Sequence, residues 1–253
     1  MVFPFVWETL TAFKTFAASI AVPPTVLPKP WVLTGFTNLF ASTQFFRMML
    51  NSVVMAVGRT VGQVVFCTMA GYAFARLPFP GHKIVFGIFL SVLMIPSQLL
   101  LLPQFEIMQV LGWLNTPQAL IVPGIFSAFG TFLMRQFFLS LPQELEDAAR
   151  VDGANPFQVF LRVMLPLARP GVVALTVFTV LWSWNDLLWP LVVTSDQSHM
   201  PLSVGLAQLI GIHQTEYPTL MAGALLAMLP MLAAFILLQR QFIEGIAFSA
   251  TKG

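Results

Sequence analysis

The chain has 253 residues, of which 57% are hydrophobic and only 9% are charged, and its formal net charge is +2. Soluble domains normally carry about 25% charged residues, so this composition excludes an ordinary soluble domain. The few cations are scattered along the chain, which excludes a basic surface for nucleic acid. The mean hydropathy of +0.83 therefore indicates a protein that is surrounded largely by lipid. The single Cys67 can form no intrachain disulfide bond.

Apolar segments of membrane-spanning length recur along the chain. A transmembrane helix needs about 20 apolar residues. The first segment, Met1 to about Phe13, is shorter than this, and we interpret it as the outer end of a truncated first span. Longer segments follow at about 48–75, 84–102, 119–138, 170–193 and 220–238. The sequence therefore predicts an all-α polytopic membrane protein with about six transmembrane helices, forming a single transmembrane domain over residues 1–253.

The basic residues predict how these spans are oriented, because cytoplasmic loops are enriched in Lys and Arg. One set of alternate loops, together with the C-terminal end, holds most of them: Arg76, Lys83, Arg135, Arg150, Arg162, Arg169, Arg240 and Lys252. The opposite side holds only Lys14, Lys29 and Arg47. We therefore expect a multi-pass protein of the cell (inner) membrane with its C-terminus in the cytoplasm.

The connection between the fourth and fifth spans contains signals for two short helices. Ser140 has the spacing of a capping box with Gln143, which predicts that a first helix begins there. Gly153 is expected to end this helix in the left-handed conformation. Asn155 and Pro156 form an N-cap and first-turn pair that predicts a second helix. The segment therefore indicates a helix–turn–helix on the cytoplasmic side.

Each predicted helix of this connection has apolar residues at helical spacing. In the first helix they are Leu145, Ala148, Ala149 and Val151, and in the second they are Phe157, Phe160, Leu161 and Met164. Two interpretations fit this pattern. The segment could be an amphipathic connector that rests on lipid headgroups, or its small residues could allow another protein to dock.

A longer motif runs through the same connection. Asp147-Ala148-Ala149, three further residues, Gly153 and then Leu165-Pro166 resemble the cytoplasmic-loop motif of permeases of binding-protein-dependent ABC importers. The context is similar to the carbohydrate-uptake branch, which includes maltose-, trehalose- and glycerol-phosphate-type permeases. This context consists of residues 141–154, Trp184-Asn185-Asp186 and the final Lys252-Gly253. Asp147 departs from the motif, which usually has Glu at this position.

The resemblance implies an assembly and a mechanism. It implies that the loop 140–170 couples this chain to an ATPase subunit, through Asp147, Ala148, Ala149, Asp152, Gly153 and Pro166. It further implies a second, different permease subunit, two copies of the ABC ATPase subunit and an extracytoplasmic solute-binding protein. The solute would be a sugar or a sugar-like compound, and transport would proceed by alternating access.

The chain itself has no features of a catalyst. It lacks the Gly-rich loop that binds nucleotide phosphates, so ATP is expected to bind to the partner subunit and no cofactor to this chain. No catalytic arrangement is recognisable, and His82, His199 and His213 do not have the spacing of metal ligands. We therefore expect a transport protein and not an enzyme.

The fifth predicted span contains an unusual polar group, Asp186, near three tryptophans. A carboxylate in a span is costly and is normally kept away from lipid. Trp182, Trp184, Asn185 and Asp186 are therefore candidates to line a solute pathway, with Trp182 and Asp186 on one helix face. Two other interpretations remain: Asp186 lies hydrated at the outer interface beside an aromatic belt, or it pairs with Arg59 of the second span.

Two other classes of function have to be weighed. An ion-coupled secondary transporter or a channel would need an ion site at the midplane and often has an internal repeat. Asp186 and Arg59 are the only residues that could form such a site, and the sequence shows no repeat. An integral membrane enzyme would need polar groups clustered at one interface, and none is apparent.

Overall fold

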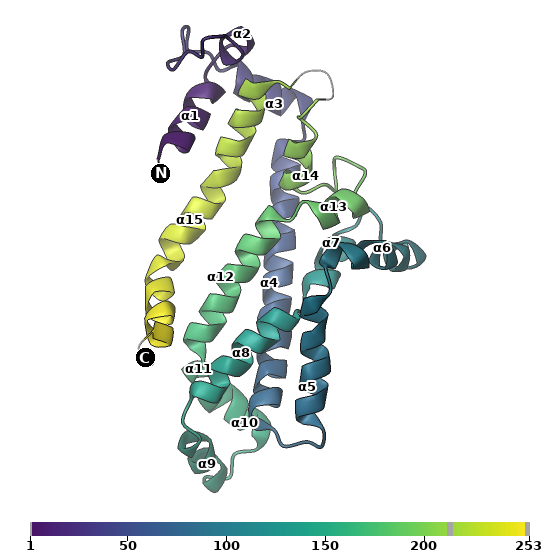
Figure 1. Ribbon diagram of the computed structural model, residues 1–253, viewed down its shortest axis with the longest axis vertical. Coiled ribbons are helices and arrows are strands. Elements are labelled where there is room, and N and C mark those ends of the chain that lie inside the picture. The colour runs from purple at the N-terminus through teal and green to yellow at the C-terminus, as the bar shows by residue number, and fades with distance from the viewer. Residues whose placement is uncertain (1, 212–214, 251–253) are drawn as a thin grey trace. The chain divides into compact units, whose positions relative to one another are not determined.

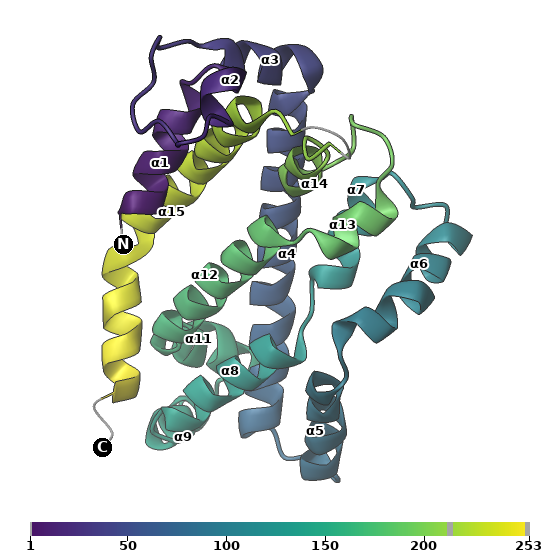
Figure 2. The same ribbon diagram turned by 45° about the horizontal axis from the view of Figure 1, so that its top comes forward.

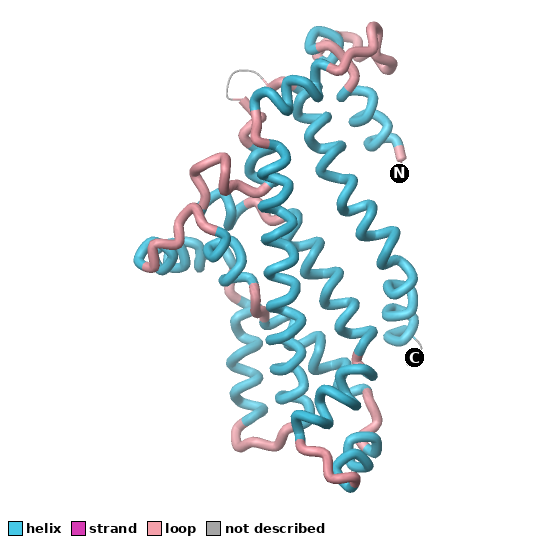
Figure 3. The backbone as a smooth tube through the Cα atoms, turned by 180° about the vertical axis from the view of Figure 1, so that it is seen from behind, coloured by secondary structure: helices cyan, strands magenta, loops and turns pink. Residues whose placement is uncertain are grey.

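The computed structural model describes residues 2–211 and 215–250, and the side chains of residues 2–211 and 215–236. All regular secondary structure in these described ranges is helical, which confirms the all-α prediction (Figure 3). The chain divides into two units, each described here by itself. Unit 1 contains residues 1–55, 112–119 and 184–237, and unit 2 contains residues 56–111, 120–183 and 238–253. The expectation of a single transmembrane domain stays a prediction.

Unit 1 combines the N-terminal helices with helices from late in the chain. Its elements are α1 (Phe3–Ala12), α2 (Phe16–Ser19), α3 (Thr34–Ser42), the first part of α4 (Phe45–Arg76), α13 (Leu188–Val193), α14 (Leu202–Ala207) and most of α15 (Tyr217–Ala250). The short helix α1 lies beside the first half of α15 in both views of the ribbon (Figures 1 and 2). The unit has its own apolar core of Leu39, Phe45, Met48 and Leu202.

Unit 2 contains the remainder of α4 and the helices of the predicted cytoplasmic connection. Its other elements are α5 (His82–Ser91), η1 (Val92–Met94), η2 (Ser97–Leu100), α6 (Leu101–Val110), η3 (Val122–Gly124), α8 (Ala128–Ser140), α9 (Glu144–Val151), α10 (Pro156–Val159), η4 (Phe160–Met164), α11 (Leu165–Leu167) and most of α12 (Arg169–Asn185). The helix α7 (Pro117–Ile121) begins in unit 1 and ends in unit 2. Helices α4, α8, η4 and α12 supply the apolar core of unit 2, which includes Tyr72, Met134, Phe138, Phe160, Met164 and Leu175.

The described helices include several that are long and apolar enough to cross a membrane. Helix α4, with 32 residues, and the 20 residues Tyr217–Ile236 of α15 pass this test as single helices. Three further pairs pass when the two helices on either side of a break are counted together, which gives up to five candidates among the described residues. These helices agree with the predicted polytopic membrane protein.

Three of the predicted spans are broken rather than continuous. The predicted span 84–102 stops at Met94, and the chain continues from Ser97 in a direction that differs by 96° (Figure 1). Ile95 is extended, with φ −88° and ψ 121°, because a residue that precedes proline is disfavoured in the helical conformation. The segment predicted at 84–102 is therefore bent rather than straight, and the position of its break at Pro96 follows from the sequence.

The fourth and fifth predicted spans are also broken. Residues 125–127 interrupt the segment predicted at 119–138, and its two halves meet at 42°. Ser127 is extended there and caps α8, because its hydroxyl accepts a hydrogen bond from the Gly130 N–H. The segment predicted at 170–193 ends as a helix at Asn185 and resumes at Leu188.

Candidate functional site

The turn after α9 has the geometry that the sequence predicts. Gly153 has a φ of +87°, in the left-handed region. Its N–H donates to the Arg150 carbonyl at 3.0 Å, and the Ala154 N–H donates to the Ala149 carbonyl at 3.0 Å. These two bonds are the pair that defines a Schellman motif, and they satisfy carbonyl groups that the end of α9 would otherwise leave unpaired. The predicted role of Gly153 in ending the helix is therefore confirmed.

The predicted beginning of this helix was wrong. Ser140 is the last residue of α8, and its hydroxyl donates to the Phe137 carbonyl at 2.8 Å. Leu141 is extended, as expected for a residue that precedes a proline, and this conformation ends α8. Helix α9 begins only at Glu144, and the residue before it, Gln143, makes no capping bond with its side chain. The Ser140 hydroxyl therefore bonds within the turn before it and does not cap α9.

The second helix of the connection begins as predicted. The Asn155 side chain accepts a hydrogen bond from the Gln158 N–H at 2.9 Å, and the Gln158 side chain accepts one from the Asn155 N–H at 3.0 Å. This reciprocal pair is a complete capping box, and Pro156 occupies the first turn. A π-helical segment, η4, lies directly before Leu165 and Pro166. The helix ends at Leu167, one residue after Pro166.

The two helices divide their apolar residues between the inside and the outside of unit 2. Val159, Phe160 and Met164 are buried and belong to the unit 2 core. Leu145, Val151, Phe157 and Leu161 are exposed, with Val151 reaching 88% exposure. The apolar faces predicted for the two helices are thus only partly buried. The connection packs its inner face against α4 and α8 and leaves an apolar outer face.

The predicted coupling residues lie mainly on this outer face. Asp147, Ala148, Asp152, Gly153 and Pro166 are exposed, whereas Ala149 is half-buried and packs against the unit 2 core. An exposed surface that combines small residues, carboxylates and apolar side chains is suited to contact with a protein. The burial of Ala149 favours a packing role for this residue.

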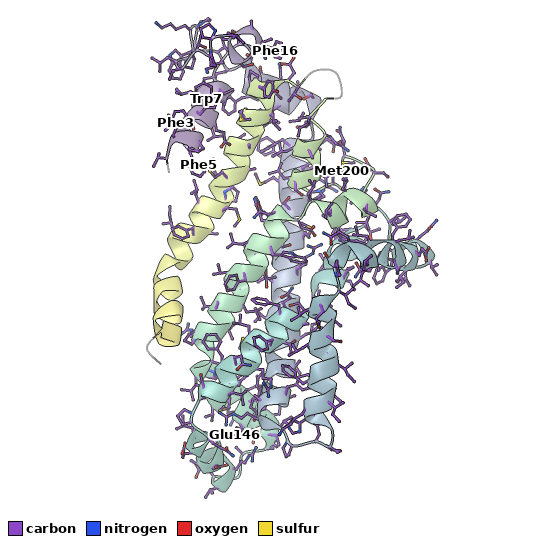
Figure 4. All side chains as sticks on the ribbon, in the orientation of Figure 1. Phe3, Phe5, Trp7, Phe16, Glu146 and Met200 are labelled. Carbon is purple, nitrogen blue, oxygen red and sulfur yellow. The ribbon has the colours of Figure 1, made fainter. Side chains whose placement is uncertain are left out.

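A buried residue that the sequence did not single out lies on the inner face of α9. Glu146 is only 2% exposed, and Figure 4 labels it near the end of the unit. The Tyr72 hydroxyl donates to its Oε1 at 2.9 Å, and Arg150 Nη2 donates to the same oxygen at 2.8 Å. Arg76 Nε lies 3.7 Å from its Oε2. Only the spacing of Glu146 and Arg150, four residues apart on one helix, was a signal in the sequence.

The candidate solute residues surround the break between α12 and α13. Asp186 lies in this break and is half-buried, and its backbone carbonyl accepts a hydrogen bond from the Ser203 hydroxyl at 2.7 Å. Asn185 is the last residue of α12 and is exposed. The helix ends before Asp186, so the prediction that Trp182 and Asp186 share one helix face was wrong.

The tryptophans of this region have different surroundings. Trp182 is 55% exposed, and the Arg59 guanidinium carbon lies 5.1 Å from the centre of its ring. Trp184 is half-buried and packs against the core of unit 1. Trp189 is buried, and its indole N–H donates to the Ala119 carbonyl at 2.8 Å. Trp189 therefore belongs to the packing of unit 1 and not to an exposed aromatic belt.

Arg59 is buried inside unit 2 and is only 1% exposed. Its Nε donates to the Leu120 carbonyl at 2.7 Å. Gly124 leaves room for the side chain, because a Cβ atom at this position would lie 2.7 Å from Arg59 Cδ. A backbone carbonyl and the Trp182 ring thus accompany the cation. The pairing of Arg59 with Asp186 stays one of the three interpretations of that carboxylate.

A polar loop follows α13 in unit 1. The Asn115 side chain accepts hydrogen bonds from the backbone N–H groups of Ser195 and Asp196 at 2.7 and 3.1 Å. Hydrogen bonds from Ser198 and His199 lower the pKa of the Asp196 carboxyl below its usual range. Among the residues that the structure describes, no three His, Cys, Asp or Glu side chains are placed to hold a metal ion. His213 lies outside the described residues.

Comparison with known proteins decides the family. The profile of the family described as "Binding-protein-dependent transport system inner membrane component" matches residues 63–247, which is most of the chain. The chain belongs to this family. It is therefore a membrane component of a binding-protein-dependent transport system, and its family has a transport role rather than a catalytic one.

Curated relatives within this family cover nearly the whole chain. The arabinooligosaccharides transport system permease protein AraQ of Halalkalibacterium halodurans is 35% identical over 255 residues, covering 100% of this chain and 91% of the relative. The sn-glycerol-3-phosphate transport system permease protein UgpE of Shigella flexneri is 33% identical over 257 residues, covering 98% and 92%. Both relatives are permease proteins of transport systems.

A chain of known structure has a fold similar to that of this chain. A chain from the crystal structure of a bacterial ABC transporter involved in the import of the acidic polysaccharide alginate matches with a TM-score of 0.83. The match covers 95% of this chain and 90% of that chain, with 21% sequence identity. The chain described here thus has the fold of a chain from an ABC importer.

Proposed function

We propose that this chain is the permease subunit of an ATP-driven importer for a sugar or a sugar-like solute, and that it works by alternating access. The observation that supports this most directly is the helix pair α9–α10. Its inner face is anchored in unit 2, while Asp147, Ala148 and Val151 are exposed. An exposed apolar surface is typical of a protein contact. An ATPase subunit that binds here can move the helices attached to the pair.

The proposed assembly contains more subunits than this chain. It includes a second and different permease subunit, two copies of an ABC ATPase subunit and an extracytoplasmic solute-binding protein. ATP binds to the ATPase subunits, and this chain requires no cofactor of its own. The C-terminus and the connection 140–170 face the cytoplasm, in agreement with the excess of Lys and Arg on that side.

The solute class is inferred from the relatives. One is named for the transport of arabinooligosaccharides and another for that of sn-glycerol-3-phosphate, so a polyhydroxylated solute is proposed here. Asn185 is the last residue of α12, and Asp186 lies in the break before α13. The side chains of both residues are therefore at an interruption of the helix. They can accept hydrogen bonds from solute hydroxyl groups, and the exposed Trp182 ring offers an apolar face to a sugar.

We call the exposed face of α9 that contains Asp147, Ala148 and Val151 the docking surface. It is tested by purifying the tagged chain from its native membrane and identifying the ATPase subunit that accompanies it. Ala148→Trp places a bulky ring on the exposed face of α9 and is expected to abolish this association. Lys83→Trp, at another exposed position of unit 2, is the matched control and should retain it. Recovery of the ATPase subunit with Ala148→Trp would contradict the proposed surface.

The purified complex also tests whether ATP drives the transport. Proteoliposomes that contain the purified complex and its binding protein should take up arabinotriose or sn-glycerol-3-phosphate only when ATP is enclosed. Uptake driven by a proton or sodium gradient without ATP would instead support the ion-coupled transporter.

A further inference from the structure

The buried carboxylate of α9 requires an explanation that the docking surface does not supply. Glu146 is 2% exposed, whereas its neighbours Glu144 and Asp147 are exposed. A carboxylate removed from water is strongly unfavourable unless it is paired and hydrogen-bonded. Its partners therefore show what this position accomplishes.

The partners of Glu146 come from two different helices. Tyr72 and Arg76 lie in the last turns of α4, with the Tyr72 hydroxyl 2.9 Å from Oε1 and Arg76 Nε 3.7 Å from Oε2. Arg150 lies one turn further along α9 and donates to Oε1 at 2.8 Å. We call Tyr72, Arg76, Glu146 and Arg150 the Glu146 cluster. A single carboxylate thus connects α9 to the end of a membrane-spanning helix.

The Glu146 cluster also contacts the end of α8. Arg76 Nη2 donates to the carbonyls of Phe138 and Leu141 at 2.7 and 2.5 Å, which lie where α8 ends. The Tyr72 ring packs against the rings of Phe138 and Phe160, with centroids 5.4 and 5.1 Å apart. Three helices and the second half of the connection therefore meet around one buried ion pair.

We propose that Glu146 is a positioning residue that locks α9 to the end of α4, so that the two helices move as one body. The inference rests on the proposed function, in which an ATPase subunit displaces α9. A helix held only by apolar contacts can slide or tilt when it is displaced. A shift of α9 would separate the buried Glu146 carboxylate from Tyr72 and Arg76 of α4 and leave it only Arg150 of its own helix, so the cluster resists such sliding. Displacement of α9 is then transmitted to the spans.

A distance measurement between the two helices tests this proposal. Spin labels at Met69→Cys on α4 and at Gln143→Cys, directly before α9, occupy exposed positions outside the proposed docking surface, while the buried Cys67 remains in place. The measurement uses the complete reconstituted complex, first without nucleotide and then with ATP and a catalytically inactive ATPase subunit. For the chain with an intact Glu146 cluster, we expect the same distance distribution in both states.

Variants of the buried carboxylate should remove this rigidity. With Glu146→Ala, the distance between the labels should shift or broaden when ATP binds, and the solute transported per ATP hydrolysed should fall by about fivefold or more. Glu146→Gln can still accept the Tyr72 hydrogen bond but loses the charge, so a smaller loss is expected. Glu144→Gln removes an exposed carboxylate from the same helix and should change neither quantity.

Four results distinguish the possible failures. An unaltered ratio of solute to ATP in both Glu146 variants would overturn the proposal, and so would a distance that changes with ATP in the intact chain. Loss of the ATPase subunit from both Glu146 variants would overturn it too, because Glu146 would then serve docking and not transmission. If no ATPase subunit accompanies even the unsubstituted chain, the proposed function itself fails.

Discussion

At the scale of single residues, the turn after α9 depends on one backbone conformation. Gly153 has open space around it, since a Cβ atom there would meet nothing within 4 Å. A substitution at this position is therefore opposed by its φ of +87° and not by crowding. The conformation costs a residue with a side chain about 1–2 kcal/mol, and β-branched residues are affected most.

This difference predicts the behaviour of two variants. Gly153→Val should weaken the turn and lower uptake by roughly five- to thirtyfold, the population change that 1–2 kcal/mol produces. Gly153→Asn should retain most of the uptake, because Asn tolerates the left-handed conformation. Uptake is measured in cells and normalised to the amount of inserted protein. Equal uptake by both variants would show that this turn has no part in transport.

The carboxylate of Asp186 permits a second prediction at this scale. If Asp186 accepts hydrogen bonds from the solute, Asp186→Asn should raise the solute concentration needed for half-maximal uptake by about tenfold, because hydrogen bonds to a charged group contribute about 1.5–3 kcal/mol. Asn185→Ala, at the neighbouring exposed position, should have a smaller effect. The same half-maximal concentration for Asp186→Asn and the unsubstituted chain would place the carboxylate outside the solute pathway.

At the scale of helices, the break before α8 is held together by Gln63 of α4. The Gln63 amide donates to the Gly124 carbonyl at 3.0 Å, and its oxygen accepts from the hydroxyls of Ser127 and Thr179 at 3.0 and 3.1 Å. A broken helix leaves backbone groups without partners, and lipid cannot satisfy them. Gln63 therefore stabilises a bend within the transmembrane helices.

This arrangement predicts a loss of stability in one variant. Gln63→Leu should lower the free energy of unfolding by about 1–3 kcal/mol, because the Gly124 carbonyl and the Ser127 hydroxyl lose a buried partner. Gln109→Leu, at an exposed position of α6, is the control and should have little effect. Thermal unfolding in detergent compares the two. Equal midpoints for Gln63→Leu and Gln109→Leu would contradict the stabilising role.

Local signals in the sequence predicted local structure well. The conformation of Gly153 and the cap at Asn155 follow from residues a few positions away, and both were confirmed. The false cap at Ser140 shows the limit of such signals, because the same pattern fits a helix that is only ending. Glu146 could not be recognised, since Tyr72 is 74 residues away and two exposed acids stand beside Glu146. Partners of that kind depend on tertiary packing, which periodicity does not report.

At the scale of the whole molecule, the family membership and the proposed orientation make a joint prediction about sidedness. The connection that contains Val151 should face the cytoplasm, where an ATPase subunit can bind it. The loop that contains Gln197 should lie on the opposite side, because one predicted span separates it from that connection. Both residues are exposed, so cysteines introduced at these positions can react.

Labelling with a membrane-impermeant maleimide measures this sidedness. In intact cells, the reagent is allowed to reach the outer face of the cell membrane but cannot cross it. Under these conditions Gln197→Cys should be labelled and Val151→Cys should not. Val151→Cys should react once the membrane is permeabilised in cells that lack the ATPase subunit, which would otherwise cover this position. The unsubstituted chain is the control, because its Cys67 is buried and should stay unlabelled in both conditions. Labelling of Val151→Cys in intact cells would reverse the orientation inferred from Lys and Arg, and the coupling surface would then face away from any cytoplasmic ATPase.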